Sequence, residues 1–248
     1  MKLKCIILIV ICLMLSITLF SQTTAAPNTH LTIGEIIKDS GFWGYMIILT
    51  FAVGLVLAAV RYHQLYHKEK IDAGKYYLKL KGYIKNDDLE EATKISESFK
   101  NTTLGFIFWS GLKVFKEMKS SGVKGQELRD SVQNAFDEAV LQTVHKLDGG
   151  LFWFDVLAQT CTYLGLLGTI WGLLIAFKAL STAATSEVNR KLTEGIKVAI
   201  GTTAMGLMAA VPLTLIKGAL LARAQSLIAD IDEYEVKIIN QINTSIKD

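Results

Sequence analysis

From Val156 to Phe177 the sequence reads VLAQTCTYLGLLGTIWGLLIAF, a stretch that contains no charged side chain. A helix needs about 20 apolar residues to cross the hydrocarbon core of a bilayer, so this stretch is long enough to span. Ser40–Val60 and Val198–Ile216 are uncharged over about the same length. Because lipid offers the backbone no hydrogen-bond partner, a helix is the expected form of each stretch. The sequence therefore predicts an all-α membrane protein with three transmembrane helices.

Charge is distributed unevenly along the chain, which has 248 residues and is 51% hydrophobic. The charged residues up to Val60 are Lys2, Lys4, Glu35, Lys38 and Asp39. Residues 61–150, in contrast, alternate Lys with Glu and Asp throughout, as expected of a segment in water. The net charge of +3 is interspersed, with no run of like charges that could follow a phosphate backbone, so nucleic-acid binding is not expected.

The N-terminus has the pattern of a secretory signal peptide, which we predict over residues 1–26. A basic start, Met1–Lys4, precedes the apolar run Cys5–Phe20, and small or polar residues follow in Ser21–Ala26. At sixteen residues the apolar run is short for a transmembrane helix. The alternative is an uncleaved anchor, which would add a fourth helix.

Basic residues after the first uncharged stretch set the expected orientation. Arg61, Lys68, Lys70 and two histidines follow it, and such clusters mark the cytoplasmic end of a span. We therefore expect a multi-pass protein of the bacterial inner membrane with a periplasmic N-terminus and a cytoplasmic C-terminus. The expected segments are a signal peptide (1–26), a periplasmic N-terminal segment (27–40), a first transmembrane helix (41–60), a cytoplasmic helical domain (61–150), a second transmembrane helix (151–180), a periplasmic loop (181–192), a third transmembrane helix (193–222) and a cytoplasmic helical tail (223–248).

The cytoplasmic segments are expected to be helical. Leu128–Val144 has apolar residues at helical spacing. Gly122 and Gly125 predict a break between two helices, and Leu78–Leu89 is expected to contain a turn. The apolar residues of Ile228–Ile246 suit an amphipathic helix that packs on neighbouring helices.

Small residues form stripes along the second and third uncharged stretches. In the second, the stripe consists of Gly165, Gly168 and Gly172. In the third, small residues recur at helical spacing: Gly195, Ala199, Thr202, Gly206 and Ala209. Small residues allow helix backbones to approach closely in lipid and gain dispersion contacts. We expect one stripe of each helix to pack within the subunit, and the remaining surface to favour homo-oligomers.

Threonines add hydroxyl groups to these surfaces. Thr169, Thr202 and Thr203 lie on the small-residue sides, with Thr162 one face over, and together they favour a polar pore wall. In the alternative, each hydroxyl only bonds the carbonyl one turn back in its own helix. None of the three uncharged stretches contains Asp, Glu or His, and hydroxyls do not hold a proton at neutral pH. A proton-carrying carboxylate is therefore expected from a partner chain with a single Asp-bearing span.

Two segments carry a family resemblance. YLGLLGTIWG (Tyr163–Gly172) and GIKVAIGTTAMGLMAAVP (Gly195–Pro212) resemble the second- and third-span signatures of the MotA/TolQ/ExbB proton channel family, most closely its ExbB/TolQ branch. The resemblance implies a pentamer around a dimer of an ExbD/TolR-like partner. Proton flow through that partner's Asp would pass work to a TonB- or TolA-like protein for outer-membrane transport. It also implies channel roles for Thr169 and Thr203 and a bend at Pro212, where a backbone hydrogen bond is lost.

The sequence departs from the family pattern at three places. Val198 stands where the best-known members have a glutamate near the start of the third span. Thr162 replaces a proline before the second-span glycines, and Lys217-Gly218 replaces an aromatic–asparagine pair. The missing glutamate leaves the partner's Asp as the expected carboxylate.

No catalytic or metal site is expected. His63 and His67 lie four residues apart, but no third ligand is evident. No glycine-rich phosphate loop or nucleophile–base pair occurs, so neither enzyme activity nor a cofactor is expected. The leading hypothesis is the channel subunit of a proton-driven motor. The alternatives are a non-conducting helical scaffold for a partner membrane protein and a stator of a surface-motility machine.

Overall fold

The computed structural model describes residues 34, 37–38, 40–69, 71–182 and 185–246. The predicted signal peptide and most of the predicted periplasmic segment 27–40 lie outside the described residues. The regular elements of the described residues are helices, which confirms the all-α class. They form two compact units. We call the described residues up to Ala59 together with Leu151–Ala219 the membrane unit, and Val60–Gly150 together with the described residues from Leu220 the helical domain.

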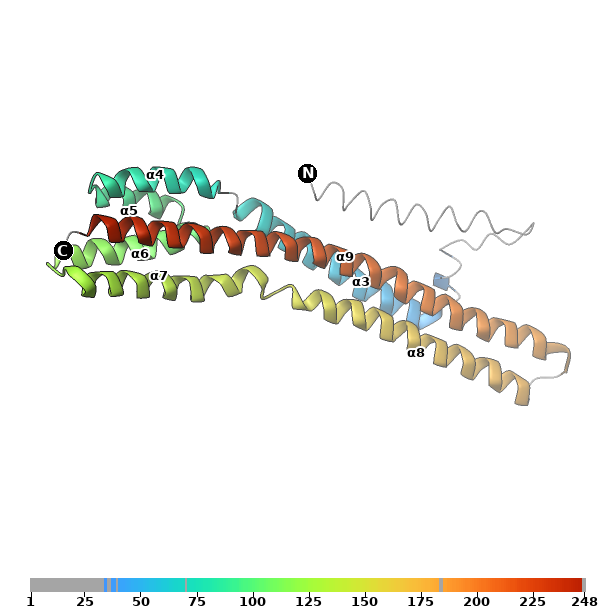
Figure 1. Cartoon of the computed structure of the whole chain (residues 1–248). Coiled ribbons are helices and arrows are strands. Elements are labelled where there is room, and N and C mark those ends of the chain that lie inside the picture. Colours follow the sequence, from blue (N-terminus) through green and yellow to red (C-terminus); the bar gives the residue numbers. More distant parts are fainter. Residues whose placement is uncertain (1–33, 35–36, 39, 70, 183–184, 247–248) are drawn as a thin grey trace. The chain divides into compact units, whose positions relative to one another are not determined.

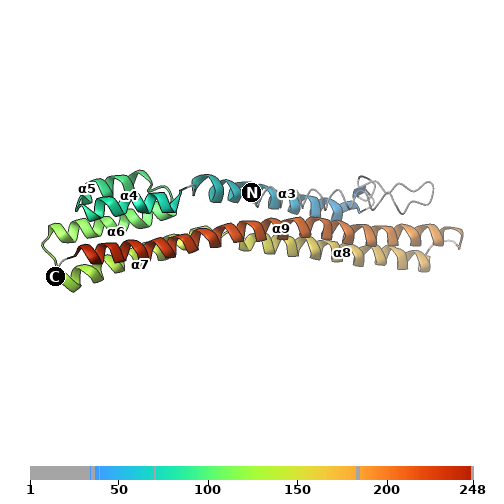
Figure 2. The same cartoon turned by 45° about the horizontal axis from the view of Figure 1, so that its top comes forward.

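Three long helices build the membrane unit: α3 (Gly41–His63), α8 (Phe152–Thr182) and α9 (Thr185–Ser245). The last residues of α3 and of α9 belong to the helical domain. Within the described chain, three helices are long and apolar enough to cross a membrane, which matches the number of predicted spans. Figures 1 and 2 show α8 and α9 running side by side.

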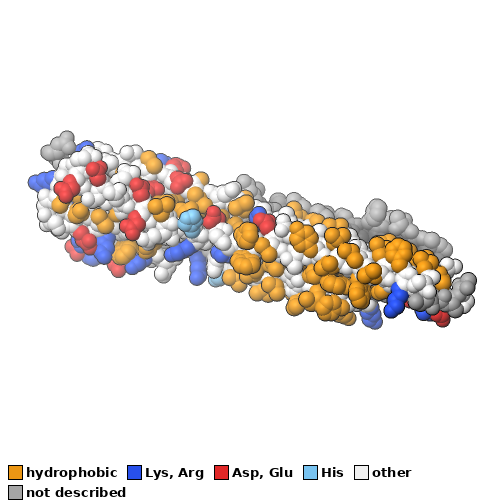
Figure 3. Space-filling model, turned by 90° about the horizontal axis from the view of Figure 1, so that it is seen from below, with side chains coloured by type: hydrophobic (Ala, Val, Ile, Leu, Met, Phe, Trp, Pro, Cys, Tyr) orange, Lys and Arg blue, Asp and Glu red, His pale blue; other side chains and the backbone are white. Residues whose placement is uncertain are grey.

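Much of the apolar surface of the membrane unit is left uncovered by the chain itself. Exposed large side chains include Leu49 and Val56 of α3, Leu166 and Trp171 of α8, and Ile200 of α9. Figure 3 shows hydrophobic side chains gathered over this unit. Exposed apolar areas of this extent mark contacts with lipid or with other proteins, as expected of a membrane protein.

The helical domain contains a short π-helix, η1 (Gln64–Lys68), and four α-helices: α4 (Ala73–Lys85), α5 (Leu89–Ser98), α6 (Thr103–Ser120) and α7 (Gly125–Asp148). Asp72, Asp88 and Thr102 stabilise the starts of α4, α5 and α6. Each of these side chains accepts a hydrogen bond from a backbone N–H in the first helical turn, which would otherwise have no partner.

Both predicted helix breaks in this domain are confirmed. The first separates Lys85 from Leu89, inside the expected turn region. The second separates Ser120 from Gly125. Gly122 and Gly125 have φ angles of 80° and 66°, a backbone conformation that glycine adopts without steric strain.

Aromatic and aliphatic side chains fill the core of the helical domain. α6 packs against both α5 and α7, and α4 packs against α5. Phe108 of α6 and Phe136 of α7 are fully buried, and their rings meet edge to face. Ile238 and Ile242 of α9 are also fully buried, whereas Val236 is exposed. Most apolar residues of the expected tail therefore pack inside the domain.

The segment 181–192, expected as a loop, is mostly helical. α8 continues to Thr182, and α9 begins at Thr185. Arg190 forms ion pairs with Glu187 and Glu194 at helical spacing, and such pairs stabilise an exposed polar helix. The side of the membrane on which this segment lies stays a prediction.

The tail 223–248, expected to be helical, continues α9 without a break as far as Ser245. The junction reads ALLARA from Ala219 to Ala224, a run of strong helix formers without a break signal. α9 also runs through Pro212, which has no N–H to donate to the preceding turn. The bend expected at Pro212 stays a prediction.

Candidate functional site

The two predicted stripes of small residues face each other between α8 and α9. Each α8 glycine lies against small residues of α9, in the pairs Gly172 with Gly195 and Ala199, Gly168 with Thr202, and Gly165 with Gly206. We call these seven residues the glycine ladder. All of them are buried, and Ala209 continues the buried stripe along α9.

The backbones of the glycine ladder approach each other too closely for larger side chains. A Cβ added to Gly172 would lie 2.6 Å from both the Ala199 nitrogen and the Gly195 oxygen. A Cβ added to Gly206 would lie 2.7 Å from the Cys161 oxygen. Because these neighbours are backbone atoms, no side-chain rotation could relieve the overlap. This is the geometry of a close-packed helix pair.

Thr202 occupies the middle of the glycine ladder. Its side chain is fully buried, and its hydroxyl donates to the carbonyl oxygens of Val198 and Ala199, at 2.9 and 3.0 Å. A Cβ added to Gly168 would lie 2.5 Å from the Cβ of Thr202. Within the subunit, Thr202 therefore contacts α8 rather than open space.

The other three threonines predicted to line a pore are more accessible. Thr169 and Thr203 are partly exposed, and Thr162 is exposed. Their hydroxyls donate within their own helices, to the carbonyl oxygens of Leu166 (2.6 Å, from Thr169), Ala199 (3.4 Å, from Thr203) and Ala158 (3.1 Å, from Thr162). These hydrogen bonds are the ones expected if each hydroxyl only bonds a carbonyl of its own helix. Each hydroxyl oxygen can still accept a hydrogen bond from water. Their pore-lining role stays a prediction.

An ion pair joins α8 and α9 at the ends of their uncharged stretches. Lys217 Nζ lies 2.6 Å from Asp155 Oδ2, with side chains 25% and 41% exposed. This ion pair is not among the predictions from the sequence, but the positions of the two residues in the sequence could have indicated it. Asp155 directly precedes one uncharged stretch, and Lys217 directly follows the next. In antiparallel helices these two positions fall at the same level.

The chemistry available within the membrane unit is limited. Its uncharged stretches supply hydroxyls and backbone carbonyls but contain no Asp, Glu or His. Among the residues that the structure describes, no three His, Cys, Asp or Glu side chains gather where they could hold a metal ion. Cys161 is buried, and its thiol is free. The unit can therefore pack closely and offer hydroxyls, but these stretches hold no carboxylate that could carry a proton.

A family model described as the MotA/TolQ/ExbB proton channel family matches residues 103–233. This range covers just over half of the chain. It includes α6, α7, α8 and most of α9, and therefore every residue of the glycine ladder.

Three relatives share part of their length with this chain. The Tol-Pal system protein TolQ of Pseudomonas aeruginosa is 29% identical over 144 residues, which cover 56% of this chain and 62% of that protein. The protein of the same name from Haemophilus influenzae is 29% identical over 155 residues, 58% of this chain and 68% of that protein. The biopolymer transport protein ExbB of Pseudomonas putida is 21% identical over 187 residues, 72% and 56% of the two chains. The chain thus spans less than two thirds of the first and third of these relatives.

Proposed function

Because the chain belongs to the MotA/TolQ/ExbB proton channel family, in its ExbB/TolQ branch, we propose that it is an inner-membrane subunit of a proton-driven, energy-transducing motor. In this role the subunit converts the proton gradient into work with an ExbD/TolR-like partner. A TonB- or TolA-like protein receives that work and uses it for transport across the outer membrane.

The glycine ladder is the observation that carries this proposal. It lies within the residues that match the proton-channel family, and it holds α8 and α9 together through backbone contacts. Thr169 and Thr203 border it and are partly exposed. A close-packed helix pair edged by hydroxyls suits the wall of a channel, because hydroxyls can orient water without binding a proton themselves.

The proposed oligomer and partner rest on two features of the membrane unit: its exposed apolar faces and the absence of a carboxylate from its uncharged stretches. Its exposed apolar faces can take up further copies of the chain and a partner helix, and we propose a pentamer around a dimer of the partner. Since the uncharged stretches contain no carboxylate, the partner supplies the Asp that carries the proton. A carboxylate in a membrane span is expensive to bury and is therefore functional where it occurs. Thr169 and Thr203, with Thr162, are the proposed polar residues of the path, whereas Thr202 is buried against Gly168 and packs the helix pair that forms its wall.

Two threonine variants test the conducting role. Thr169→Ala and Thr203→Ala each remove one hydroxyl from a partly exposed position, so the complex should still assemble. Proton flux through the reconstituted complex should fall about fivefold for each variant, which corresponds to one lost hydrogen bond of about 1 kcal/mol. Thr214→Ala is the matched control, because the Thr214 hydroxyl also bonds a carbonyl of its own helix, that of Ala210. Its flux should be unchanged.

A non-conducting scaffold is the second candidate function. It is favoured by one observation, that the four threonine hydroxyls all donate to carbonyls of their own helices. A scaffold would keep normal activity in both alanine variants and lose assembly in Gly168→Leu. Unchanged proton flux in both alanine variants would therefore contradict the channel, as would a purified complex without an Asp-bearing single-span protein.

A further inference from the structure

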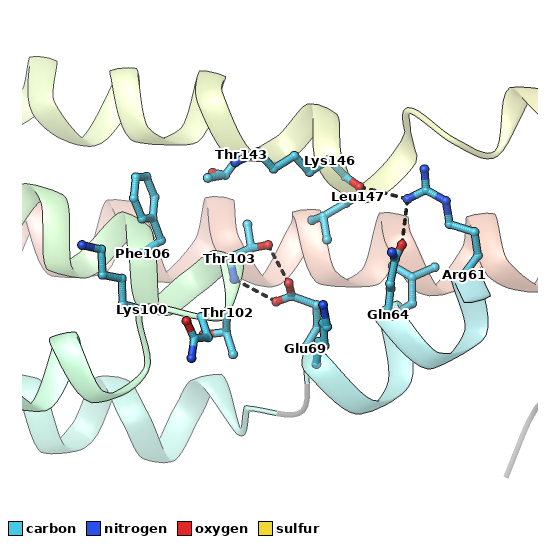
Figure 4. A pocket seen from close by; sticks show the side chains of 13 residues that line it. Arg61, Gln64, Glu69, Lys100, Thr102, Thr103, Phe106, Thr143, Lys146 and Leu147 are labelled. Carbon is cyan, nitrogen blue, oxygen red and sulfur yellow. Dashed lines mark hydrogen bonds between the residues drawn. The ribbon is translucent and has the colours of Figure 1, made fainter. Parts of the chain in front are cut away.

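The helical domain contains a pocket of about 440 Å³ (Figure 4). It is lined by the end of α3, by η1, by the connection from α5 to α6, by the start of α6 and by the end of α7. Its volume is in the usual range for small-ligand sites, about 300–1,000 Å³. Four cationic side chains line this pocket: Arg61, Lys68, Lys100 and Lys146. Glu69 is the one carboxylate in its lining. The pocket is therefore strongly basic.

The Glu69 carboxylate is already engaged by a helix start. One oxygen accepts the backbone N–H of Thr103 at 2.9 Å, and the other accepts the Thr103 hydroxyl at 2.8 Å. Figure 4 shows this pair in the middle of the lining, with Arg61 at one end and Lys100 at the other. Glu69 therefore serves as a cap of α6.

The partners that the structure shows for these four cations are uncharged. Within the described part of the chain, none of them forms an ion pair with an acidic side chain. Arg61 Nη1 donates to Gln64 Oε1 at 3.1 Å and to the Lys146 carbonyl at 3.4 Å. The Lys100 ammonium lies 3.6 Å from the centre of the Trp109 ring. The pocket thus keeps an uncompensated positive charge that an anion could neutralise.

Two of the cations lie close to predicted spans. Arg61 directly follows Val60, the last residue of the first uncharged stretch, and Lys146 lies in the last turn of α7, shortly before α8. A Cβ added to Gly150 would overlap the Arg61 guanidinium, so these two junctions are in contact. Basic residues at such junctions lie at the level of the lipid headgroups on the cytoplasmic side.

We propose that this pocket binds the phosphate group of an anionic phospholipid of the cytoplasmic leaflet. The phosphodiester oxygens would accept charge-assisted hydrogen bonds from Arg61, Lys68 and Lys146. A choline lipid carries its own cation beside the phosphate and would bind less well. A soluble phosphate offers the same oxygens, but the lipid is concentrated at this level of the chain. The site is independent of proton conduction, so either proposal can fail without the other.

Lipid retention by the purified full-length complex tests this proposal. Complexes extracted from vesicles of equal phosphatidylglycerol and phosphatidylcholine content are analysed by native mass spectrometry for bound lipid. The unaltered chain should retain phosphatidylglycerol preferentially. Lys68→Gln with Lys146→Gln should weaken this retention about 30-fold, since each lysine near an anionic surface contributes about fivefold. Arg61 is left in place because it also bonds Gln64 and the Lys146 carbonyl.

Two further double variants separate the pocket from general charge effects. Lys79→Gln with Lys116→Gln removes the same charge from exposed positions outside the pocket and should leave lipid retention unchanged. Lys68→Arg with Lys146→Arg keeps the charge and should retain the lipid. Equal losses in the two glutamine variants would overturn the proposal. Displacement of phosphatidylglycerol by an equal concentration of inorganic phosphate would overturn the lipid as the source of the anion.

Discussion

The Lys217 ammonium of α9 donates a hydrogen bond to the Asp155 carboxylate of α8 at 2.6 Å. The ion pair lies where the uncharged stretch of α8 begins and that of α9 ends. Apart from Gly195, the glycine ladder joins the two helices within these stretches. The ion pair also gives a role to Lys217, which departs from the family pattern. Because both side chains are partly exposed, solvent screens their attraction, and the expected coupling is at most about 1 kcal/mol.

A double-mutant cycle should detect this coupling. Asp155→Asn and Lys217→Met should each lower the thermal stability of the detergent-solubilised protein, and the double variant should lose less than the sum of the two. The reciprocal exchange, Asp155→Lys with Lys217→Asp, should recover most of the loss. Strictly additive effects in the cycle would show that the contact contributes nothing to stability.

A methyl group in the middle of the glycine ladder should destabilise the helix pair. Gly168→Ala places a Cβ about 2.5 Å from the Cβ of Thr202, and overpacking of this kind lowers stability by roughly 1–3 kcal/mol. Thermal unfolding followed by circular dichroism would measure the loss. Adding Thr202→Gly removes the opposing Cβ and should restore part of it.

Gly218 provides the matched control for that substitution. It lies in α9, and a Cβ there would meet no atom within 4 Å. Gly218→Ala should therefore raise stability by up to about 1 kcal/mol through helix propensity alone. If the two alanine substitutions had the same effect, close approach at Gly168 would not be the cause.

Loss of the Glu69 carboxylate should loosen the start of α6. Glu69→Gln keeps one acceptor but removes the charge beside the helix N-terminus, and a lost cap lowers stability by about 1 kcal/mol. Hydrogen exchange of the Thr103 amide should become faster. Glu97→Gln, an exposed position near the end of α5, should leave this exchange rate unchanged.

Glu235 should make the stability of the helical domain depend on pH. Its side chain is 9% exposed, and burial, with repulsion from Asp137 and Asp232, raises its pKa from 4.5 to about 7. The folded state therefore holds this proton more tightly than the unfolded state. The resulting stability is fully present below pH 4.5 and is lost as pH rises to about 7.

The variant Glu235→Gln removes this titration. It should stabilise the protein by up to about 3 kcal/mol at pH 8 and have little effect at pH 4.5, as thermal unfolding at the two pH values would show. Glu233→Gln is the control, since Glu233 is exposed and pairs with Lys237. A gain in the Glu235 variant that did not depend on pH would argue against a raised pKa.

The sequence predicts a helix or a helix end well where one local feature is enough to fix it. An uncharged stretch such as Val156–Phe177 is long enough to predict a membrane-spanning helix by itself. Gly122 and Gly125 separate two helices at positions where the backbone has a positive φ. The segment 181–192 is different, because its polar composition suits a loop and an exposed helix equally well. Its ion pairs at helical spacing stabilise the helix, yet composition alone does not reveal them.

In the candidate site, too, some features could be predicted from the local sequence and others could not. The spacing of Gly165, Gly168 and Gly172 identifies a packing stripe, because the periodicity of one helix is contained in its own sequence. Which residue lies opposite each glycine depends on how two helices cross, and that is a tertiary property. Thr202 therefore looks like a pore residue in the sequence, although within the subunit it is buried against Gly168.

Direct backbone contact in the glycine ladder has a mechanical consequence. Side chains can change rotamer and let two helices slip past each other, but backbone atoms have no such freedom. A shift of α8 by one turn, about 5.4 Å, would drive Thr202 and Ala199 over the ridges between the glycines. We therefore expect α8 and α9 to move together as one rigid pair, and to change contacts with other helices at their exposed faces, where Leu166 and Ile200 lie.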